Sequence, residues 1–299
     1  MQPNPVLKKL GCSPDDRLVI IHTDDIGMCQ ASVEAFADLW DYGLISSGAV
    51  MVPCSWFLEI ADFARSNPDV DLGVHLTLTC EYQTYKWGPI STRDPKTGLM
   101  DARGFFHRSS KDVWVNADPE AAFVELDTQI SRAIAEGINV THIDTHMGSV
   151  AHPKFVQGYI QLATKYGLPP MVPRMSAEAL TAGQGIDEST AQMITGLINT
   201  LEEMGFPLID HIAGLQLEDA ADRVAQAKHA LGSLKPGITH FIIHPAKDTP
   251  ELRHITESWD CRSADYRTFL SDEIRDFVYD EGIQVIGYNA LKDLMPETA

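Results

Sequence analysis

The stretch "LVIIHTDDIG" (residues 18–27) joins an apolar run to two adjacent aspartates. Its first four residues, Leu18 to Ile21, are typical of a strand buried on both faces, as the strands of a parallel sheet are. Asp24 and Asp25 follow where that strand should end. Two neighbouring carboxylates repel each other unless a cation, a shared proton or solvent separates them. The pair therefore marks this strand end as a candidate functional site.

Seven further apolar runs follow and alternate with longer helical patterns. The runs are ISSGAVMV (45–52), VDLGVHLTL (70–78), INVTHID (138–144), PMVPRM (170–175), PLIDHIA (207–213), ITHFIIH (238–244) and IQVIGY (283–288). Eight strands separated by helices indicate a parallel α/β sheet, and eight is the number that closes a (β/α) barrel. Pro170 and Pro173 weaken the fifth run as a strand. We therefore expect a single (β/α) barrel with seven or eight parallel strands, regular or irregular at the fifth run.

The helical patterns lie between these runs, at 31–42, 55–66, 118–136, 153–167, 188–204, 217–231 and 264–281. No Pro-, Gly- or Ser-rich linker divides the chain, so we expect one domain over residues 1–299. One segment interrupts the alternation, because residues 80–116 after the third run are aromatic and punctuated by Gly and Pro. A long loop at this end of a barrel is usually functional, and we interpret the segment as a loop insertion.

The net charge is strongly negative. Lys and Arg total 23 against 42 Asp and Glu, which gives −19 at pH 7. This balance argues against binding to nucleic acid or to an anionic membrane surface. The five cysteines form no CxxC pair, and an odd number in a long chain fits a reducing compartment. The start lacks the apolar core of a signal peptide and no apolar run reaches the roughly 18 residues of a membrane span, so we expect a cytoplasmic protein.

Chemically active side chains recur at the carboxyl ends of the predicted strands, where barrel enzymes gather their catalytic groups. Besides the two aspartates they are His75, His142, Asp144, His146 and His244. Histidines and a carboxylate that meet at one end of a barrel suit a divalent metal with open positions for water and substrate. Such placement of independent polar groups at the same end of different strands indicates a metal site.

Each motif alone also has a structural interpretation. An Asp-Asp pair at a strand end often caps a helix or forms a turn, and His75 alone fits a core histidine equally well. The HIDTH motif is more specific because His142, Asp144 and His146 alternate onto one face of a strand, which is costly without a cation or solvent. Three other histidines are interpreted as structural or core residues: His22, His211 and His240.

Four motifs together resemble the YdjC-like carbohydrate deacetylase family in order and spacing. They are HTDDIGMCQ (22–30), LGVHLTLT (72–79), THIDTHMG (141–148) and IIHPA (242–246), and the resemblance extends to SWDCRSADYRTF (258–269). It implies a (β/α) barrel related to polysaccharide deacetylases and the hydrolysis of N-acetyl groups from sugars by a metal-activated water. It also implies one divalent metal ion, with magnesium or zinc expected first, held by Asp25, His75 and His146.

The same resemblance implies a role for Asp24, and the expected chemistry gives roles to three further residues. Asp24 would be the general base, and His244 would protonate the leaving amine. Asp144 would hydrogen-bond a ligand histidine, as carboxylates next to metal sites often do. Arg262 would orient a carboxylate or a sugar hydroxyl, with a surface salt bridge as the alternative. Many members of the family carry a further histidine where this chain has Gly148, which affects the expected substrate and leaves the ligands unchanged.

Two other functions stay open on the residues alone. One is a metal-dependent sugar isomerase or epimerase on a similar barrel, and the other is a non-catalytic barrel that binds a metal or a sugar. Serine hydrolase and nucleotide chemistry lack support because neither a GxSxG elbow nor a glycine-rich phosphate loop is present. A homodimer is expected by analogy with the family. The loop aromatics either contact a sugar ring or pack the loop onto the barrel: Tyr82, Tyr85, Trp87, Phe105 and Phe106.

Overall fold

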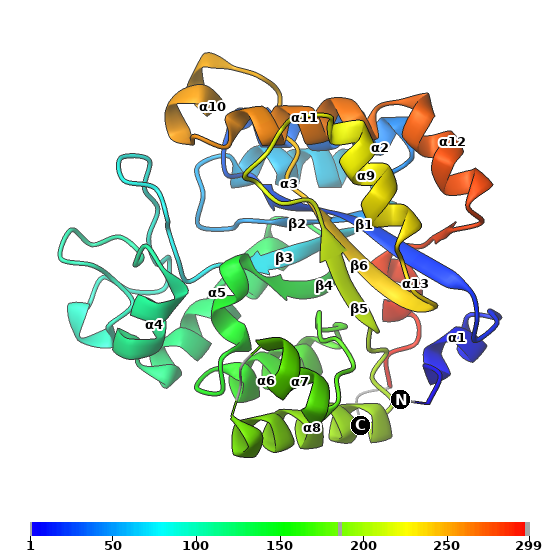
Figure 1. The fold of residues 1–299 in the computed structure, drawn as a ribbon. Coiled ribbons are helices and arrows are strands. Elements are labelled where there is room, and N and C mark those ends of the chain that lie inside the picture. Colours follow the sequence, from blue (N-terminus) through cyan, green and yellow to red (C-terminus); the bar gives the residue numbers. More distant parts are fainter. Residues whose placement is uncertain (1, 185–186, 297–299) are drawn as a thin grey trace.

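The structure is a computed structural model that describes residues 2–184 and 187–296 (Figure 1). Its described residues form a sheet of seven strands in which every pairing is parallel. The strands are β1 (Arg17–Ile26), β2 (Ser47–Val50), β3 (Leu72–Leu76), β4 (Val140–Thr145), β5 (His211–Gly214), β6 (Gly237–Ile243) and β7 (Gln284–Val285). Their order is β4-β3-β2-β1-β6-β5, with β7 beside β1. The expected parallel α/β sheet is confirmed.

The fifth apolar run, 170–175, links the two edge strands of this sheet without forming a strand itself. Pro170 bridges to Ile143 of β4, and Pro173 bridges to Ile209 just before β5. The backbone N–H groups of Met171 and Arg174 donate to the same two residues, Ile143 and Ile209. Proline has no N–H for a sheet ladder, so only the residues after each proline donate. This irregular segment joins β4 to β5, as the two prolines predicted.

The eighth run, 283–288, is largely not a strand, which corrects the expectation of a full-length strand there. Only β7 remains, and it pairs with Leu18 and Val19 at the start of β1. β6 lies along one edge of β1, so β7 and β2 both pair with the opposite edge of β1. β7 takes the start of that edge, and β2 takes it from His22 onwards. Gly287 then caps helix α13, so the chain turns away after two strand residues.

Helices cover the outside of the sheet, with α2, α3, α9, α11 and α12 on one side in Figure 1 and α6 to α8 on the other. Those that match predicted patterns are α2 (Gln30–Tyr42), α3 (Phe57–Ser66), α5 (Pro119–Ala135), α6 (Val156–Tyr166), α8 (Glu188–Glu203) and α9 (Arg223–Gly232). The predicted helix 264–281 is two helices, α11 (Trp259–Phe269) and α12 (Asp272–Asp280). The others are α1 (Pro5–Lys9), α4 (Ser110–Asn116), α7 (Ala177–Gln184), α10 (Pro250–Ile255), α13 (Tyr288–Lys292) and the 3₁₀ turns η1 (Pro95–Thr97) and η2 (His146–Ala151).

The side chains of β1 alternate between two cores. Val19 and Ile21 pack under the surrounding helices, whereas Leu18 and Ile20 belong to a separate interior cluster. That cluster includes Leu7 of α1 and residues of β6 and α13, so apolar side chains fill the amino end of the sheet interior. The inward row of β1 then continues towards the carboxyl end with polar residues.

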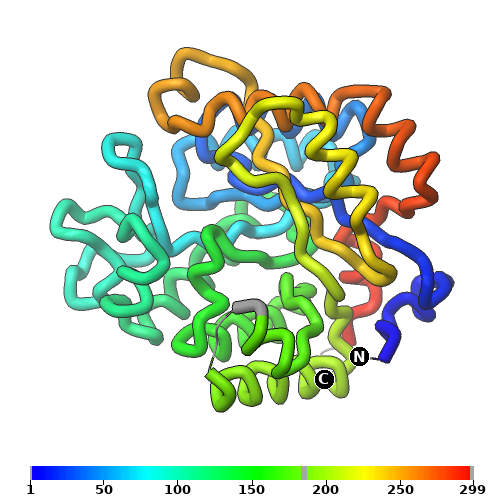
Figure 2. Tube along the Cα trace, in the orientation of Figure 1, coloured from blue at the N-terminus to red at the C-terminus, as the bar shows by residue number. Residues whose placement is uncertain are grey.

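The segment 80–116 forms a lobe beside the sheet (Figure 2). It contains η1 and α4, and a hydrogen bond from the Cys80 N–H to the His107 carbonyl pairs its first residue with the stretch before α4. Among the described residues, no helix has the length and apolar character needed to cross a membrane.

Candidate functional site

A β-bulge brings both aspartates of the DDIG motif to the same place. The register between β1 and β2 shifts between Thr23 and Ile26, because three residues advance on β1 while two advance on β2. Asp25 has a φ of 61°, which is unusual for a residue other than glycine. A regular strand would send successive side chains to opposite faces, and the bulge removes that alternation. Both carboxylates therefore lie near the same histidine, His75.

Three buried side chains form the candidate metal centre: Asp25, His75 and His146. Oδ1 of Asp25 lies 3.5 Å from Nε2 of His75 and 3.2 Å from Nδ1 of His146. It has no hydrogen-bond partner although it is buried. An orphaned carboxylate oxygen beside two imidazole nitrogens is costly unless a cation satisfies it. Two nitrogens and one oxygen are a donor set that fits a divalent ion with open positions, so the predicted ligands come together.

Two carboxylates fix which nitrogen of each histidine faces Asp25. Oδ1 of Asp144 lies 2.8 Å from Nδ1 of His75, as the sequence predicted for Asp144. Oε2 of Glu81 lies 3.1 Å from Nε2 of His146. Because an N–H must point at each carboxylate, the opposite nitrogen of each ring is left to hold a cation. Sequence reasoning missed Glu81, which is one carboxylate at the start of a long loop and carries no pattern.

The neighbouring charges hold the two histidines in their protonated forms when no cation is present. Burial alone would lower the pKa of His146, but Glu81 and Asp25 outweigh it and raise that pKa to about 9. Burial would also lower the pKa of His75, but Asp144 and Asp24 outweigh it and raise that pKa well above its usual value. The site is therefore rich in negative charge that attracts either protons or a metal ion.

Asp24 lies beside the candidate metal centre with one oxygen engaged. Its Oδ1 lies 2.7 Å from Nδ1 of His22, inside the sheet. Its Oδ2 faces Nε2 of His75 at 3.7 Å and Nε2 of His244 at 3.9 Å. Burial would raise the pKa of Asp24, but His75, His22 and His244 together hold it below its usual value. Asp24 is therefore an ionised carboxylate with a free oxygen at the site.

His244 follows β6 directly, and its side chain lies beside Asp24 at the same centre. The Asp265 carboxylate accepts a hydrogen bond from the His244 backbone N–H at 3.0 Å, and Arg223 in turn lies 2.7 Å from Asp265. The side chain of His244 is 20% exposed, and its Nδ1 has no partner among the described residues. Burial lowers the pKa of His244, so its ring is neutral in the resting protein.

Arg262 is not on the surface, which excludes the surface salt bridge considered from the sequence. Its guanidinium is 3% exposed, and Nη2 lies 2.8 Å from Oδ2 of Asp25 and 3.3 Å from the hydroxyl of Tyr82. Its Nε and Nη1 are buried without a hydrogen-bond partner in the described part of the chain. Arg262 thus neutralises Asp25 and retains two unsatisfied donors beside the site.

The loop aromatics divide into packed and partly exposed residues. Phe106 is fully buried, and Trp87 is buried with its indole N–H bonded to the Thr79 carbonyl at 2.8 Å. The Tyr85 hydroxyl donates to the Met28 carbonyl, which ties the loop to β1's end. Packing of the loop onto the sheet therefore accounts for these three aromatics. Tyr82 reaches the candidate site through Arg262, and the Trp87 ring lies near His146 with a centroid distance of 6.3 Å.

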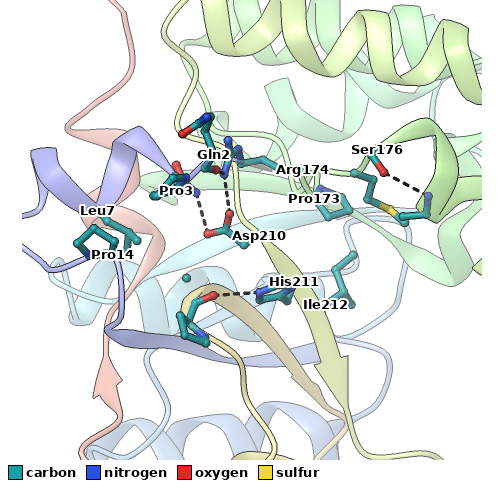
Figure 3. Close-up of a pocket in the computed structure, with 15 residues that line it drawn as sticks. Gln2, Pro3, Leu7, Pro14, Pro173, Arg174, Ser176, Asp210, His211 and Ile212 are labelled. Carbon is teal, nitrogen blue, oxygen red and sulfur yellow. Dashed lines mark hydrogen bonds and ion pairs between the residues drawn. The ribbon is translucent and has the colours of Figure 1, made fainter.

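A cavity of about 640 Å³ lies away from these residues, at the amino end of the sheet (Figure 3). It is lined by α1, the start of β6 and the residues before β5, and includes Arg174 and Asp210. Arg174 lies 3.0 Å from Asp210 and 2.9 Å from Glu202, so its charge is already compensated. Catalytic groups of barrels gather at the opposite end, where the candidate metal centre lies.

Comparison with known proteins places the chain in a family. The family model described as "YdjC-like protein" matches residues 18–280. A carbohydrate deacetylase of Thermus thermophilus is 32% identical over 272 residues, which cover 90% of this chain and 92% of that protein. A carbohydrate deacetylase of Thermoanaerobacter pseudethanolicus is 24% identical over 276 residues, which cover 92% of this chain and 100% of that protein.

A solved structure shares the fold. It is that of a putative cellobiose-phosphate cleavage protein from Enterococcus faecalis, with a TM-score of 0.74 and 23% identity, covering 92% of this chain and 99% of that one. The family match spans the β1 bulge, the candidate metal centre and Arg262. The chain belongs to the YdjC-like protein family.

Proposed function

We propose that the protein is a metal-dependent carbohydrate deacetylase that removes acetyl groups from N-acetylated sugars. The relatives named carbohydrate deacetylase support the reaction class. The observation that carries the metal dependence is the orphaned Oδ1 of Asp25, which faces imidazole nitrogens of His75 and His146. Asp25, His75 and His146 would hold one divalent ion, zinc or magnesium first. When bound, the ion would polarise the amide carbonyl and make a water molecule more acidic.

The residues around that centre divide the proton transfers. Asp24 would accept a proton from the attacking water at Oδ2, since Oδ1 is already engaged by His22. His244 is neutral at rest and lies 3.9 Å from that oxygen, so it is placed to take the proton on and deliver it to the leaving amine. One proton then leaves the water and one reaches the amine, which balances the reaction.

Arg262 and the loop 80–116 supply the substrate contacts in this proposal. The two free donors of Arg262 would bind a sugar oxygen or the carbonyl oxygen next to the metal. Tyr82 would shape the wall of the site, because its hydroxyl contacts Arg262. Two expectations from the sequence stay predictions beside these roles: one domain over residues 1–299 and a homodimer, which limited proteolysis and light scattering test.

The experiment that tests the proposal combines elemental analysis of the purified protein with acetate release from N-acetylated mono- and disaccharides. We expect one divalent ion per chain and acetate release that a chelator abolishes and the ion restores. Isomerisation of the sugar without acetate would identify the isomerase alternative. Sugar binding without turnover of any acetylated substrate would identify a non-catalytic barrel, and equal activity after metal removal would refute the metal dependence.

A further inference from the structure

A chain of hydrogen bonds runs from Asp24 into the interior of the sheet. Its first member is His22, which is fully buried and lies with Nδ1 2.7 Å from Oδ1 of Asp24. Its second member is His142, also fully buried, whose Nε2 lies 2.9 Å from Nε2 of His22. Both rings belong to the inward rows of their strands, β1 and β4, one step below the candidate metal centre.

The chain ends on a carboxylate that is anchored to the backbone. Nδ1 of His142 lies 2.9 Å from the Thr141 hydroxyl, which donates to Asp71 at 2.6 Å. Asp71 also accepts hydrogen bonds from the Ser47 hydroxyl at 2.8 Å and from the Asn289 backbone N–H at 2.7 Å. Asp71 directly precedes β3 and bonds residues of β2, β4 and the first turn of α13, so three other elements fix the far end of the chain.

The contacts leave neither nitrogen of His22 free. Its Nδ1 carries a hydrogen, because the partner is a carboxylate oxygen that is an acceptor only. The contact between the two Nε2 atoms requires one shared proton, because two facing lone pairs would repel. His22, Asp24, Asp144 and His240 have ligand-type atoms within 4.8 Å of one another. With both of its nitrogens hydrogen-bonded, His22 nevertheless offers no lone pair to a second metal ion.

We propose that His22 is a positioning residue for Asp24 and that His142 holds His22 in place for this role. The Nδ1–H group of His22 fixes Oδ1 of Asp24 and so directs Oδ2 towards the metal centre and His244. His142, bound through Thr141 to Asp71, prevents the His22 ring from turning. The inference rests on the proposed function, in which Asp24 accepts the proton of the attacking water. It assigns a role to His22, which the sequence pattern indicates only as a structural residue, and a supporting role to His142.

Two substitutions of His22 distinguish the roles of its two ring nitrogens. In His22→Asn the amide nitrogen takes the position of Nδ1 and keeps the donor to Asp24. In His22→Gln the amide takes the position of Nε2, so the contact to His142 is kept and the donor to Asp24 is lost. We expect His22→Gln to lower kcat by about 10- to 100-fold, the usual effect of losing such a supporting partner, with KM and metal content unchanged. His22→Asn should keep most of the turnover.

His240→Asn is the matched control. His240 lies in the same buried layer, with its ring centroid 4.4 Å from that of His22, and its Nδ1 bonds the Tyr288 hydroxyl instead of Asp24. The His240→Asn variant should keep the wild-type kcat. Thermal unfolding of all variants measures how much stability is lost when a buried ring is removed. Equal losses of kcat in His22→Asn and His22→Gln, tracking their unfolding temperatures, would overturn the proposal. Wild-type kcat in His22→Gln would overturn it too.

A second readout needs no substrate. In metal-free protein labelled with ¹⁵N-histidine, the Nδ1–H proton of His22 should be strongly downfield and slow to exchange, and it is assigned by its loss in His22→Gln. It should shift in Asp24→Asn and in His142→Gln and stay in place in Asp127→Asn, whose carboxylate pairs with Lys165 at the surface. A resonance insensitive to Asp24→Asn would refute the hydrogen bond. If the wild type releases no acetate, the proposed function fails while this measurement still decides the hydrogen-bonded chain.

Discussion

Nη2 of Arg262 lies 2.8 Å from Oδ2 of Asp25, and both side chains are almost fully buried. The two oxygens of this carboxylate therefore have different partners, because Oδ1 faces the imidazoles of His75 and His146. Burial would raise the pKa of Asp25, but Arg262 and the two histidines hold it well below its usual value. Arg262 thus keeps Asp25 ionised and available as a ligand.

The ion pair predicts a large stability loss when Arg262 is replaced. Arg262→Met leaves a buried carboxylate without its partner, which typically costs about 3–5 kcal/mol of unfolding free energy. Chemical denaturation of the metal-free variant measures this, and added zinc or magnesium should restore part of the loss. Arg253→Met is the control, since its pair with Asp248 is exposed and screened by solvent, so its loss should change stability little. Similar losses of unfolding free energy in the two variants would show that the buried pair of Arg262 contributes no more to stability than the exposed pair of Arg253.

The position of the site was predictable because it depends on local rules. Parallel strands end at a common edge, so polar residues at their carboxyl ends must meet. Alternation along β4 likewise sends His142, Asp144 and His146 to one side, and their contacts with His22, His75 and Asp25 confirm it.

What the sequence left out depends on contacts between distant segments. The bulge that turns Asp25 into the site needs a register shift against β2, which no pattern in DDIG records. Glu81 and Arg262 become parts of the site only because a loop and a helix fold back over the strand ends. The eighth run is apolar enough for a strand, yet β6 occupies one edge of β1 and β2 occupies the other edge from His22 on. Only a short stretch of β1 is therefore left for it to pair with.

Metal binding should strengthen as the pH rises towards 9. The pKa of His146 is raised to about 9, and that of His75 is raised as well, so below these values an ion must displace protons. Each displaced proton makes the affinity rise about tenfold per pH unit, and the gain ends above the raised pKa. Calorimetric titration in buffers of different ionisation enthalpy counts the protons released per ion.

Glu81→Gln is the control for that titration. Without the Glu81 carboxylate the pKa of His146 falls towards its usual value, although Asp25 still raises it, so a larger share of the rings is neutral at about pH 8. Fewer protons should then leave on metal binding than in the wild type. Unchanged proton release would mean that Glu81 does not set the charge of His146.

His244→Gln should separate proton delivery from metal binding. The side chain contacts Asp24 at 3.9 Å and is not among the three residues of the metal centre, so metal content should stay normal. Turnover should fall by about 10²–10⁴-fold, the usual contribution of one proton transfer. A substrate with a better leaving amine should recover part of the rate, because it needs less help from an acid. Loss of the metal would instead make His244 a ligand and overturn its role as the acid.

Asp24 and Asp25 stand side by side, and the structure predicts opposite consequences for the same substitution. Asp25→Asn replaces the anionic donor of the metal centre by a neutral amide and should weaken metal binding strongly. Asp24→Asn should keep the metal, since Oδ1 of Asp24 bonds His22 and the residue is outside the three-residue centre. It removes the proton acceptor, so turnover should fall by about 10²–10⁴-fold.

Metal content by mass spectrometry and acetate release, measured on both aspartate variants, decide between these roles. The side chains keep almost the same size, so both proteins should fold, and thermal unfolding checks that they do. Equal loss of metal in both variants would make both carboxylates ligands, and the base would then have to be sought at Asp144, which already bonds His75 at 2.8 Å. Near-normal turnover in Asp24→Asn would show that Asp24 is not the base. Asp25 could not replace it in that role, because Arg262 holds its Oδ2 and its Oδ1 faces the metal position.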